Sequence, residues 1–285
     1  MENLYEKTKY IMRKYNISAN KSLGQNFLIN NEVVESIISS SNINKNDLVI
    51  EIGPGLGTLT EYLIQKAGKV LAIELDERML KILNDRFGEY DNFEVINQDV
   101  LKVELNKIIN EQKQNKNIKN VKIVANLPYY ITTPIIMKLL EEKLDINSIT
   151  VMVQKEVAER LIATPGDKLS GAITYCVYYY ADSENIMIVP NTSFIPEPEV
   201  ESQVIKLNIR KKAPVEIKNE QLFFRIIKVS FMQRRKTLVN ALVNGGVVQD
   251  KKKAKELILS IGLNENIRGE ALTIEQFADL SNQLN

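Results

Sequence analysis

The tetrapeptide Asn126-Leu127-Pro128-Tyr129 brings an amide, a backbone carbonyl and an aromatic ring together. It follows an apolar run at residues 121–125 that predicts a buried strand, and the proline ends that strand because it cannot donate to a central ladder. An amide oxygen and a carbonyl can accept hydrogen bonds from an exocyclic amine, and a tyrosine ring can stack on a base. This combination suits chemistry on an adenine amino group, although Asn-x-Pro also often simply ends a strand.

A glycine-rich segment, Glu51-Ile52-Gly53-Pro54-Gly55-Leu56-Gly57, follows an apolar run at residues 47–52. Its glycines allow a ligand to approach the backbone closely, and the helix expected next adds free N–H groups at its N-terminus. The spacing is G-x-G-x-G rather than the G-x-G-x-x-G of dinucleotide binders, and the Lys-Ser/Thr of a phosphate loop is missing. We therefore expect a nucleoside-type ligand in preference to a pyrophosphate.

Two carboxylates are expected at the same edge of the sheet, since ligands bind where parallel strands end. Glu74 lies at the end of the strand predicted at 70–75, placed to accept both hydroxyls of a ribose. Asp99 follows the strand predicted at 93–97, placed to accept the amine of an adenine. Each of these acids alone could be an ordinary loop residue, but together with Gly53 and Gly55 they fit S-adenosylmethionine as the cofactor.

The sequence contains no histidine, which removes the commonest general base and metal ligand. A zinc deaminase is excluded on this ground, and we expect no metal. The single cysteine, Cys176, lies in an apolar run that predicts core, so it is not a candidate nucleophile. It also excludes an internal disulfide and fits a reducing compartment. The chemistry must therefore work without strong proton abstraction.

Charge is unevenly distributed, although the net charge is only +1. The basic segment Lys206–Lys255 has 14 Lys/Arg and 3 Asp/Glu, a net +11, which leaves −10 for the remainder. It includes Arg234, Arg235 and Lys236. A basic block beside an acidic body suggests a polyanionic partner, although a charge run alone is also typical of a solvated lysine-rich surface.

Strands and helices alternate over about 200 residues, which predicts an α/β fold with a mainly parallel sheet covered on both faces. The remaining predicted strands are 149–154 and a final pair at 186–189 and 202–209. Helices are predicted at 59–67, 78–87, 134–142 and 171–181, and a short helix is predicted within the first 30 residues. After residue 210 only helices are predicted, at 220–241, 252–261 and 274–280. We therefore expect a catalytic domain at 1–210 and a small all-α domain at 211–285.

The composition is that of an ordinary globular protein, with 285 residues, 44% of them hydrophobic and 26% charged. The N-terminus has no apolar leader, and no stretch approaches the ~18 apolar residues of a membrane span. We expect a cytoplasmic monomer without membrane association.

Taken together, these residues resemble the ribosomal RNA adenine N6-dimethyltransferase family over nearly the whole chain. The segments that carry the resemblance are Gln25-Asn26-Phe27-Leu28, Glu51–Gly57, Glu74, Gln98-Asp99, Asn126–Tyr129, Gln154–Arg160, Phe194-x-Pro196-x-Pro198-x-Val200-x-Ser202 and Arg234–Leu238. There is one departure: Ser170 stands where relatives often have a tyrosine, which leaves the local substrate contacts open.

The resemblance implies a Rossmann-like methyltransferase sheet, a small helical domain that binds rRNA, and an N-terminal segment, residues 1–30, that contributes to the cofactor site. It implies that Asn126 to Tyr129 and Phe194 hold the target adenine. Phe194 lies in a loop with prolines, so we expect it to be exposed and to stack on the base opposite Tyr129. The implied cofactor contacts are Asn26, Leu28, Gly53, Gly55, Glu74, Asp99 and Asn126.

The most similar branch of that family dimethylates two adjacent adenines near the 3′ end of 16S rRNA, which implies a 30S partner and a role in small-subunit biogenesis. The alternatives are a resistance methyltransferase acting on 23S rRNA, a DNA adenine methyltransferase, and a non-catalytic assembly factor on the same fold. A nicotinamide oxidoreductase is least favoured, given the glycine spacing and the absence of histidine.

Overall fold

The computed structural model describes residues 3–20, 23–233 and 235–284. They form two compact units. The first, here called the sheet unit, comprises residues 1–158 and 183–209; the second, the helical unit, comprises 159–182 and 210–285. Residues 159–182, assigned to the first domain from the sequence, thus group with the C-terminal helices. The domain boundary at residue 210 remains a prediction.

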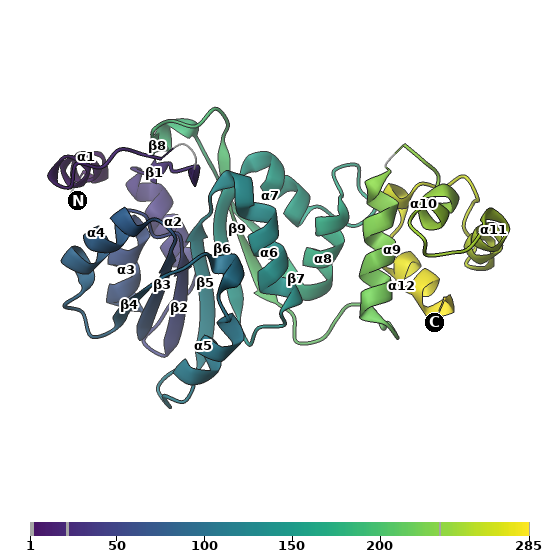
Figure 1. Ribbon diagram of the computed structural model, residues 1–285, viewed down its shortest axis with the longest axis horizontal. Coiled ribbons are helices and arrows are strands. Elements are labelled where there is room, and N and C mark those ends of the chain that lie inside the picture. Colours follow the sequence, from purple (N-terminus) through teal and green to yellow (C-terminus); the bar gives the residue numbers. More distant parts are fainter. Residues whose placement is uncertain (1–2, 21–22, 234, 285) are drawn as a thin grey trace. The chain divides into compact units, whose positions relative to one another are not determined.

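The sheet unit is built on a seven-stranded sheet in the order β4-β3-β2-β5-β6-β9-β7 (Figure 1). The strands from β4 to β6 pair in parallel, and β9 pairs antiparallel with β6. All six residues of β2 are buried, which requires cover on both faces of the sheet. The strands are β2 (Asp47–Ile52), β3 (Lys69–Glu74), β4 (Phe93–Asn97), β5 (Asn120–Asn126), β6 (Ser148–Gln154), β7 (Ala181–Val189) and β9 (Ser202–Ile209).

Seven α-helices belong wholly or partly to the described part of the sheet unit, and the sequence predicted four of them: α3, α4, α6 and the short N-terminal helix α1. It missed α2, α5 and α7. The missed α2 has a recognisable start, because the Asn30 side chain accepts hydrogen bonds from the backbone N–H groups of Glu32 and Val33. The helices are α1 (Leu4–Lys14), α2 (Asn31–Ser40), α3 (Thr58–Lys66), α4 (Glu77–Phe87), α5 (Leu105–Gln112), α6 (Thr132–Glu141) and α7 (Lys155–Ile162).

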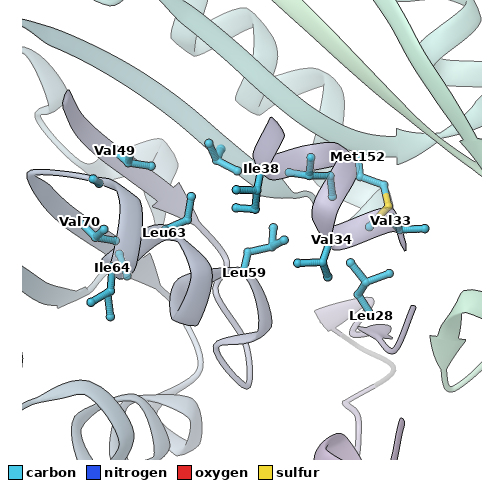
Figure 2. Packing of buried hydrophobic residues seen from close by; sticks show 14 of the residues in the cluster. Leu28, Val33, Val34, Ile38, Val49, Leu59, Leu63, Ile64, Val70 and Met152 are labelled. Atoms are coloured by element: carbon cyan, nitrogen blue, oxygen red, sulfur yellow. The ribbon is translucent and has the colours of Figure 1, made fainter. Parts of the chain in front are cut away.

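One hydrophobic cluster joins α2 and α3 to a face of the sheet (Figure 2). Leu63 of α3 and Val34 of α2 are fully buried in it, and so are Val49 of β2 and Met152 of β6. Leu28 extends this cluster to the two-residue strand β1 (Phe27–Leu28), which pairs antiparallel with β8 (Phe194–Ile195). The core therefore fixes the N-terminal segment as well as the sheet.

The helical unit contains α8 (Ala172–Tyr180), α9 (Glu220–Met232), α10 (Leu238–Asn244), α11 (Lys251–Ser260) and α12 (Ile274–Gln283). The single helix predicted at 220–241 is wrong, since α9 and α10 are separate helices. Thr237 causes the new start: its backbone is extended and its side chain accepts from the Asn240 N–H, as in a helix N-cap.

Tyr175 is the centre of the helical unit's core. It is fully buried, and its ring lies edge-on to Phe277 with the centroids 5.0 Å apart. Its hydroxyl donates to the Leu272 carbonyl (2.5 Å) and accepts from the Gly166 N–H (3.0 Å), so the buried polar atom is satisfied. Burial raises the pKa of this phenol to about 12.

Among the described residues, no helix combines the length and the apolar character that crossing a membrane would require.

A buried ion pair lies at the amino ends of β2 and β5. Asp47 is fully buried, and its carboxylate accepts from Lys122 Nζ (2.8 Å), Asn120 Nδ2 (2.9 Å) and the Asn44 N–H (2.9 Å). The pair joins the two central strands at the end of the sheet opposite their carboxyl ends.

We predict that Asp47→Ala lowers the free energy of unfolding by about 3–5 kcal/mol, because it leaves the Lys122 ammonium buried without its partner. Urea denaturation measures this change. The matched control is Asp145→Ala, which removes the 76% exposed carboxylate of the Lys113–Asp145 pair and should cost less than about 1 kcal/mol. Equal losses in the two variants would contradict the prediction.

Candidate active site

The site lies where the order of the strands reverses. β2 pairs with β3 on one side and with β5 on the other, so the connections that leave the carboxyl ends of β2 and β5 diverge and open a crevice. Ile52 and Ala125 are register partners in this pair. Gly53, which follows β2, and Asn126, the last residue of β5, are therefore placed side by side at the mouth of the crevice.

A pocket of about 710 Å³, open to solvent on one side, occupies this position. We call it the glycine-loop pocket. Gly53, Gly55 and Gly57 all have positive φ (67°, 55° and 82°), a conformation that other residues rarely adopt. The residues that line the glycine-loop pocket are Gly24, Gln25, Asn26, Phe27, Leu28, Glu51, Gly53, Pro54, Gly55, Leu56, Thr58, Leu59, Glu74 and Asn126 to Tyr129.

A second pocket, of about 480 Å³, shares Gln25, Gly53, Glu74 and Pro128 with the first. We call it the Asp99 pocket. Most of its other lining is apolar, and Glu74 and Asp99 are its acidic residues. The remaining lining residues are Leu23, Ile52, Ile73, Leu75, Gln98, Val100, Tyr130, Ile131 and Ile135.

The structure brings most of the predicted site residues to these two pockets. Asp99 lines the Asp99 pocket, and Leu127, Pro128 and Tyr129 line the glycine-loop pocket. Their contacts with a ligand remain predictions. The other predicted residues that line the glycine-loop pocket are Asn26, Leu28, Gly53, Gly55, Glu74 and Asn126.

The expected exposure of Phe194 is wrong. Its side chain is 3% exposed and packs in the cluster of α2 and α3, and it lines neither pocket. The proline-containing loop does not leave it in solvent because Phe194 begins β8 and pairs with Leu28 in β1. A contact between Phe194 and the target base remains a prediction.

The side chain of Asn126 has a fixed orientation. Its Nδ2 donates to the backbone carbonyl of Asn26 at 3.3 Å, and a carbonyl can only accept. The amide oxygen is therefore directed away from Asn26. Leu127 donates its own N–H to the Met152 carbonyl at 3.1 Å. Within the described part of the chain, no protein donor reaches the Asn126 Oδ1 or the Leu127 carbonyl, so both oxygens are available to a ligand.

The Glu74 carboxylate is held by two backbone groups. Its Oε2 accepts from the Gly55 N–H (3.0 Å) and its Oε1 from the Asp76 N–H (2.8 Å). Burial raises the pKa of Glu74 above the usual range of a carboxyl. The two hydrogen bonds fix the carboxylate at the junction of the two pockets, and each oxygen keeps a further lone pair for a hydroxyl donor.

Gln25 and Glu51 are among the lining residues that the sequence analysis did not predict as site residues. Gln25 bridges two segments, because its Nε2 donates to Asp76 Oδ2 (2.9 Å) and its Oε1 accepts from the Asn20 N–H (2.8 Å). The Arg78 guanidinium donates to both carboxylate oxygens of Asp76 and lowers the pKa of that carboxyl. Both residues lie inside motifs that the sequence analysis identified, because Gln25 precedes Asn26 directly and Glu51 begins the glycine-rich segment.

Ser170, the one departure from the family pattern, is fully buried in the helical unit beside the Tyr175 hydroxyl. Its burial argues against a direct substrate contact by this side chain.

The two pockets fit S-adenosylmethionine by the chemistry of their lining. The apolar walls of the Asp99 pocket suit a purine, and its two acids suit an amine and ribose hydroxyls. A Cβ added at Gly53 would have its nearest contact at 3.9 Å, so this space is left for a ligand rather than filled by protein. No cluster of three or more His, Cys, Asp or Glu side chains suited to a metal occurs among the described residues.

A model of the ribosomal RNA adenine dimethylase family matches residues 16–285. The "Ribosomal RNA small subunit methyltransferase A" of Alkaliphilus oremlandii is 47% identical over 279 residues, which cover 98% of this chain and 96% of the relative. The protein of the same name from Bacillus pumilus is 48% identical over 280 residues, with 98% and 95% covered.

Two solved structures have the same fold. The dimethyladenosine transferase of Plasmodium falciparum has a TM-score of 0.73 at 26% identity, with 89% of this chain and 95% of that chain covered. The 23S rRNA methyltransferase ErmE has a TM-score of 0.68 at 22% identity, with 91% and 99% covered.

Fold and site thus define an S-adenosylmethionine-dependent methyltransferase, which confirms the α/β prediction. The chain belongs to the ribosomal RNA adenine dimethylase family.

Glu51 makes the stability of the fold depend on pH. Its side chain is 1% exposed, and burial raises its pKa from 4.5 to about 8, against the opposing effect of the hydrogen bond from Thr60 Oγ1 (2.6 Å). The Glu74 carboxylate raises it further. A carboxyl with a raised pKa stabilises the fold while it is protonated, and this contribution is lost as the pH rises toward the folded-state value.

We predict that Glu51→Gln is stabilised relative to the wild type by about 1.4 kcal/mol for each pH unit between pH 4.5 and about 8. The glutamine keeps an oxygen for Thr60 but has no proton to lose. Urea denaturation of the free protein at several pH values measures the difference, with Glu94→Gln as an exposed control. Parallel stability–pH curves for the wild type and Glu51→Gln would contradict the prediction.

Proposed function

We propose that the protein transfers methyl groups to N6 of two adjacent adenosines near the 3′ end of 16S rRNA in the 30S subunit, as a step of small-subunit biogenesis in the cytoplasm. The observation that carries the proposal is the pair of available oxygens, Asn126 Oδ1 and the Leu127 carbonyl, beside the glycine-loop pocket. The choice of the small subunit rests on the near-full-length relatives of that name at 47–48% identity.

When bound, the cofactor supplies a methyl group on a positively charged sulfur, which needs no further activation. The chain's task is then mainly to position the acceptor. The N6 lone pair of adenine is delocalised into the ring, so the amine is a poor nucleophile. Asn126 Oδ1 and the Leu127 carbonyl accept its two N–H groups, and these bonds favour a pyramidal nitrogen whose lone pair faces the cofactor.

Removal of a proton does not require a strong base at this site. Once the nitrogen has gained a methyl group it is cationic and acidic, so its proton can pass to solvent. This agrees with the absence of histidine from the sequence. After one methylation a single N–H remains, and one acceptor oxygen is enough to orient the amine for the second transfer.

Tyr129 is the ring that stacks on the target base in this proposal. It lines the glycine-loop pocket, and burial raises the pKa of its hydroxyl, which therefore stays protonated. The base must leave its helical stack to reach the pocket, and a stacking ring contributes about 1–3 kcal/mol to holding it. Phe194 is proposed to support the base through a modest shift of β8, since it lies beside Leu28.

The basic segment Lys206–Lys255 is proposed to bind rRNA phosphates, but not through all of its cations. Lys206 is 7% exposed within β9, and Arg210 is paired with Asp182 at 2.6 Å. Arg234 lies outside the described residues. The exposed cations that remain for phosphate contacts include Arg235, Lys236, Lys251, Lys252 and Lys253.

The test is to incubate the protein with methyl-labelled S-adenosylmethionine and 30S subunits that lack these methyl groups, and to identify the labelled nucleosides. We expect dimethyladenosine at two adjacent positions near the 3′ end of 16S rRNA. Label in 23S rRNA but not in 30S subunits would move the assignment to a large-subunit enzyme. Label in neither, with the cofactor still bound, would favour a non-catalytic assembly factor.

In the same assay, Asn126→Ala is expected to lower kcat by about 100-fold or more, the scale of a lost transition-state acceptor. Cofactor Kd, measured by calorimetry, should change by less than about tenfold, because Asn126 is one of several lining groups. Asn30→Ala is the matched control, as Asn30 caps α2 and lines neither pocket. Equal losses in kcat and cofactor affinity for Asn126→Ala would contradict the proposed role.

Phosphate contacts make binding depend on salt. We predict that the double variant Arg235→Gln/Lys236→Gln raises the Kd for 30S subunits and reduces the slope of log K against log[salt] by about 1.4–1.8, the value for two lost contacts. Filter binding at several KCl concentrations measures both. The control is Lys116→Gln/Lys119→Gln, which removes two exposed charges from the sheet unit. The same reduction of slope in both double variants would argue against a dedicated surface.

A further inference from the structure

A hydrogen bond between two hydroxyl groups links the target-base motif to the antiparallel edge of the sheet. Ser202, the first residue of β9, is fully buried, and its Oγ lies 2.6 Å from the Tyr129 hydroxyl. Among the described residues, the Tyr129 hydroxyl is the hydrogen-bond partner of this side chain. A buried hydroxyl without a partner is costly, so the Ser202 hydroxyl requires the Tyr129 hydroxyl.

The two partners differ in how firmly the backbone holds them. Tyr129 begins a three-residue 3-10 turn, Tyr129–Ile131, directly after the proline. Ser202 instead belongs to the β6–β9 pair, where it is the register partner of Gln154 in a ladder that continues to Ser148 and Asn208. The rigid member of the pair is therefore Ser202, and the bond fixes the far end of the Tyr129 ring.

The position of Ser202 is itself secured. The preceding residue, Glu201, accepts the Lys155 N–H on its carbonyl at 3.0 Å, and its carboxylate pairs with Lys155 Nζ at 2.7 Å. Ser202 also ends the segment that starts with Phe194 and β8. One hydrogen bond thus joins the two segments, residues 126–129 and 194–202, from which the target-base contacts are proposed to come.

We propose that Ser202 is a positioning residue, which sets the plane of the Tyr129 ring for stacking on the target adenine. The inference rests on the proposed function, since it assumes that Tyr129 stacks on a base. Ser202 does not touch the reacting atoms in this scheme. It acts through Tyr129, and losing the hydroxyl should let the ring rotate away from the stacking orientation.

The hydrogen bond predicts an unequal response of the single and double variants. Ser202→Ala frees the ring but leaves the Tyr129 hydroxyl next to a pocket where water can reach it. Tyr129→Phe leaves the Ser202 hydroxyl buried without a partner, which is the more costly change. The double variant Tyr129→Phe/Ser202→Ala removes both groups and should be no less active than Tyr129→Phe. The two effects are therefore expected to be non-additive.

The experiment measures kcat and KM on 30S subunits, cofactor Kd and Tm for the three variants. A control is Ser148→Ala, because Ser148 is a buried serine of the same strand pair, on β6. We expect Ser202→Ala to lower kcat about three- to tenfold, the effect of one neutral hydrogen bond, with cofactor Kd unchanged and with a Tm change similar to that of Ser148→Ala.

A spectroscopic readout separates positioning from stability. 2-Aminopurine at either target position of the 16S rRNA becomes brighter when it leaves its stack and dimmer when it stacks on an aromatic ring. We expect brighter fluorescence in the Ser202→Ala complex than in the wild-type complex, and no difference for Ser148→Ala.

The outcomes distinguish the two levels of the proposal. If the wild-type protein does not methylate 30S subunits, the proposed function fails, and the role of Ser202 fails with it. If the wild type is active while Ser202→Ala keeps full kcat and wild-type fluorescence, only the positioning role is overturned. Additive losses in the double variant, or a fall in Tm without a fall in kcat, would likewise make Ser202 a purely structural residue.

Discussion

The parallel pairing of β2 with β5 is the constraint on which the site depends. Ile52 and Ala125 are register partners, so the glycine loop and the Asn126 motif emerge next to each other at one edge of the sheet. A shift of one residue would turn every side chain of β5 to the opposite face and move Asn126 away from Gly53. The buried cluster of α2 and α3 and the Asp47–Lys122 pair both act on these central strands, and so they hold the register.

The N-terminal segment completes the site through hydrogen bonds rather than through the sheet. The Asn26 carbonyl orients the Asn126 amide, and Gln25 attaches the segment to Asp76, whose backbone N–H in turn holds Glu74. β1 then pairs with β8, which places Leu28 beside Phe194. The two pockets are therefore assembled from segments far apart in the sequence, and each contributes polar groups already fixed by protein contacts before a ligand arrives.

The sequence predicted the structure best where a residue type serves a single structural purpose. The alternation of apolar runs, the glycine-rich segment and the acids at strand ends located the sheet and the crevice, because the carboxyl ends of parallel strands meet at one edge of a sheet. It failed where tertiary pairing overrides local composition. Phe194 lies in a loop rich in proline, yet it forms strand β8 because it pairs with Leu28 of β1. Residues 220–241 have a continuous helical pattern, yet Thr237 caps a second helix there. The bonds of Gln25 and Ser202 span 51 and 73 residues, and no local pattern encodes such partners.

The electrostatics of the pockets favour a cationic ligand. Glu51 and Glu74 are both buried, burial raises the pKa of each, the Glu74 carboxylate raises that of Glu51 further, and Asp99 lines the adjoining pocket. The described lining residues of the two pockets include no lysine or arginine that would neutralise them. A carboxyl in this position is costly to ionise until an opposite charge enters, and a bound cation would lower its pKa. A ligand with a positively charged sulfur and an ammonium group supplies that charge, whereas its neutral product retains only the zwitterionic end. The same acids that destabilise the empty fold at high pH would thus bind the methyl donor more tightly than the product, which favours exchange of product for donor between the two methylations.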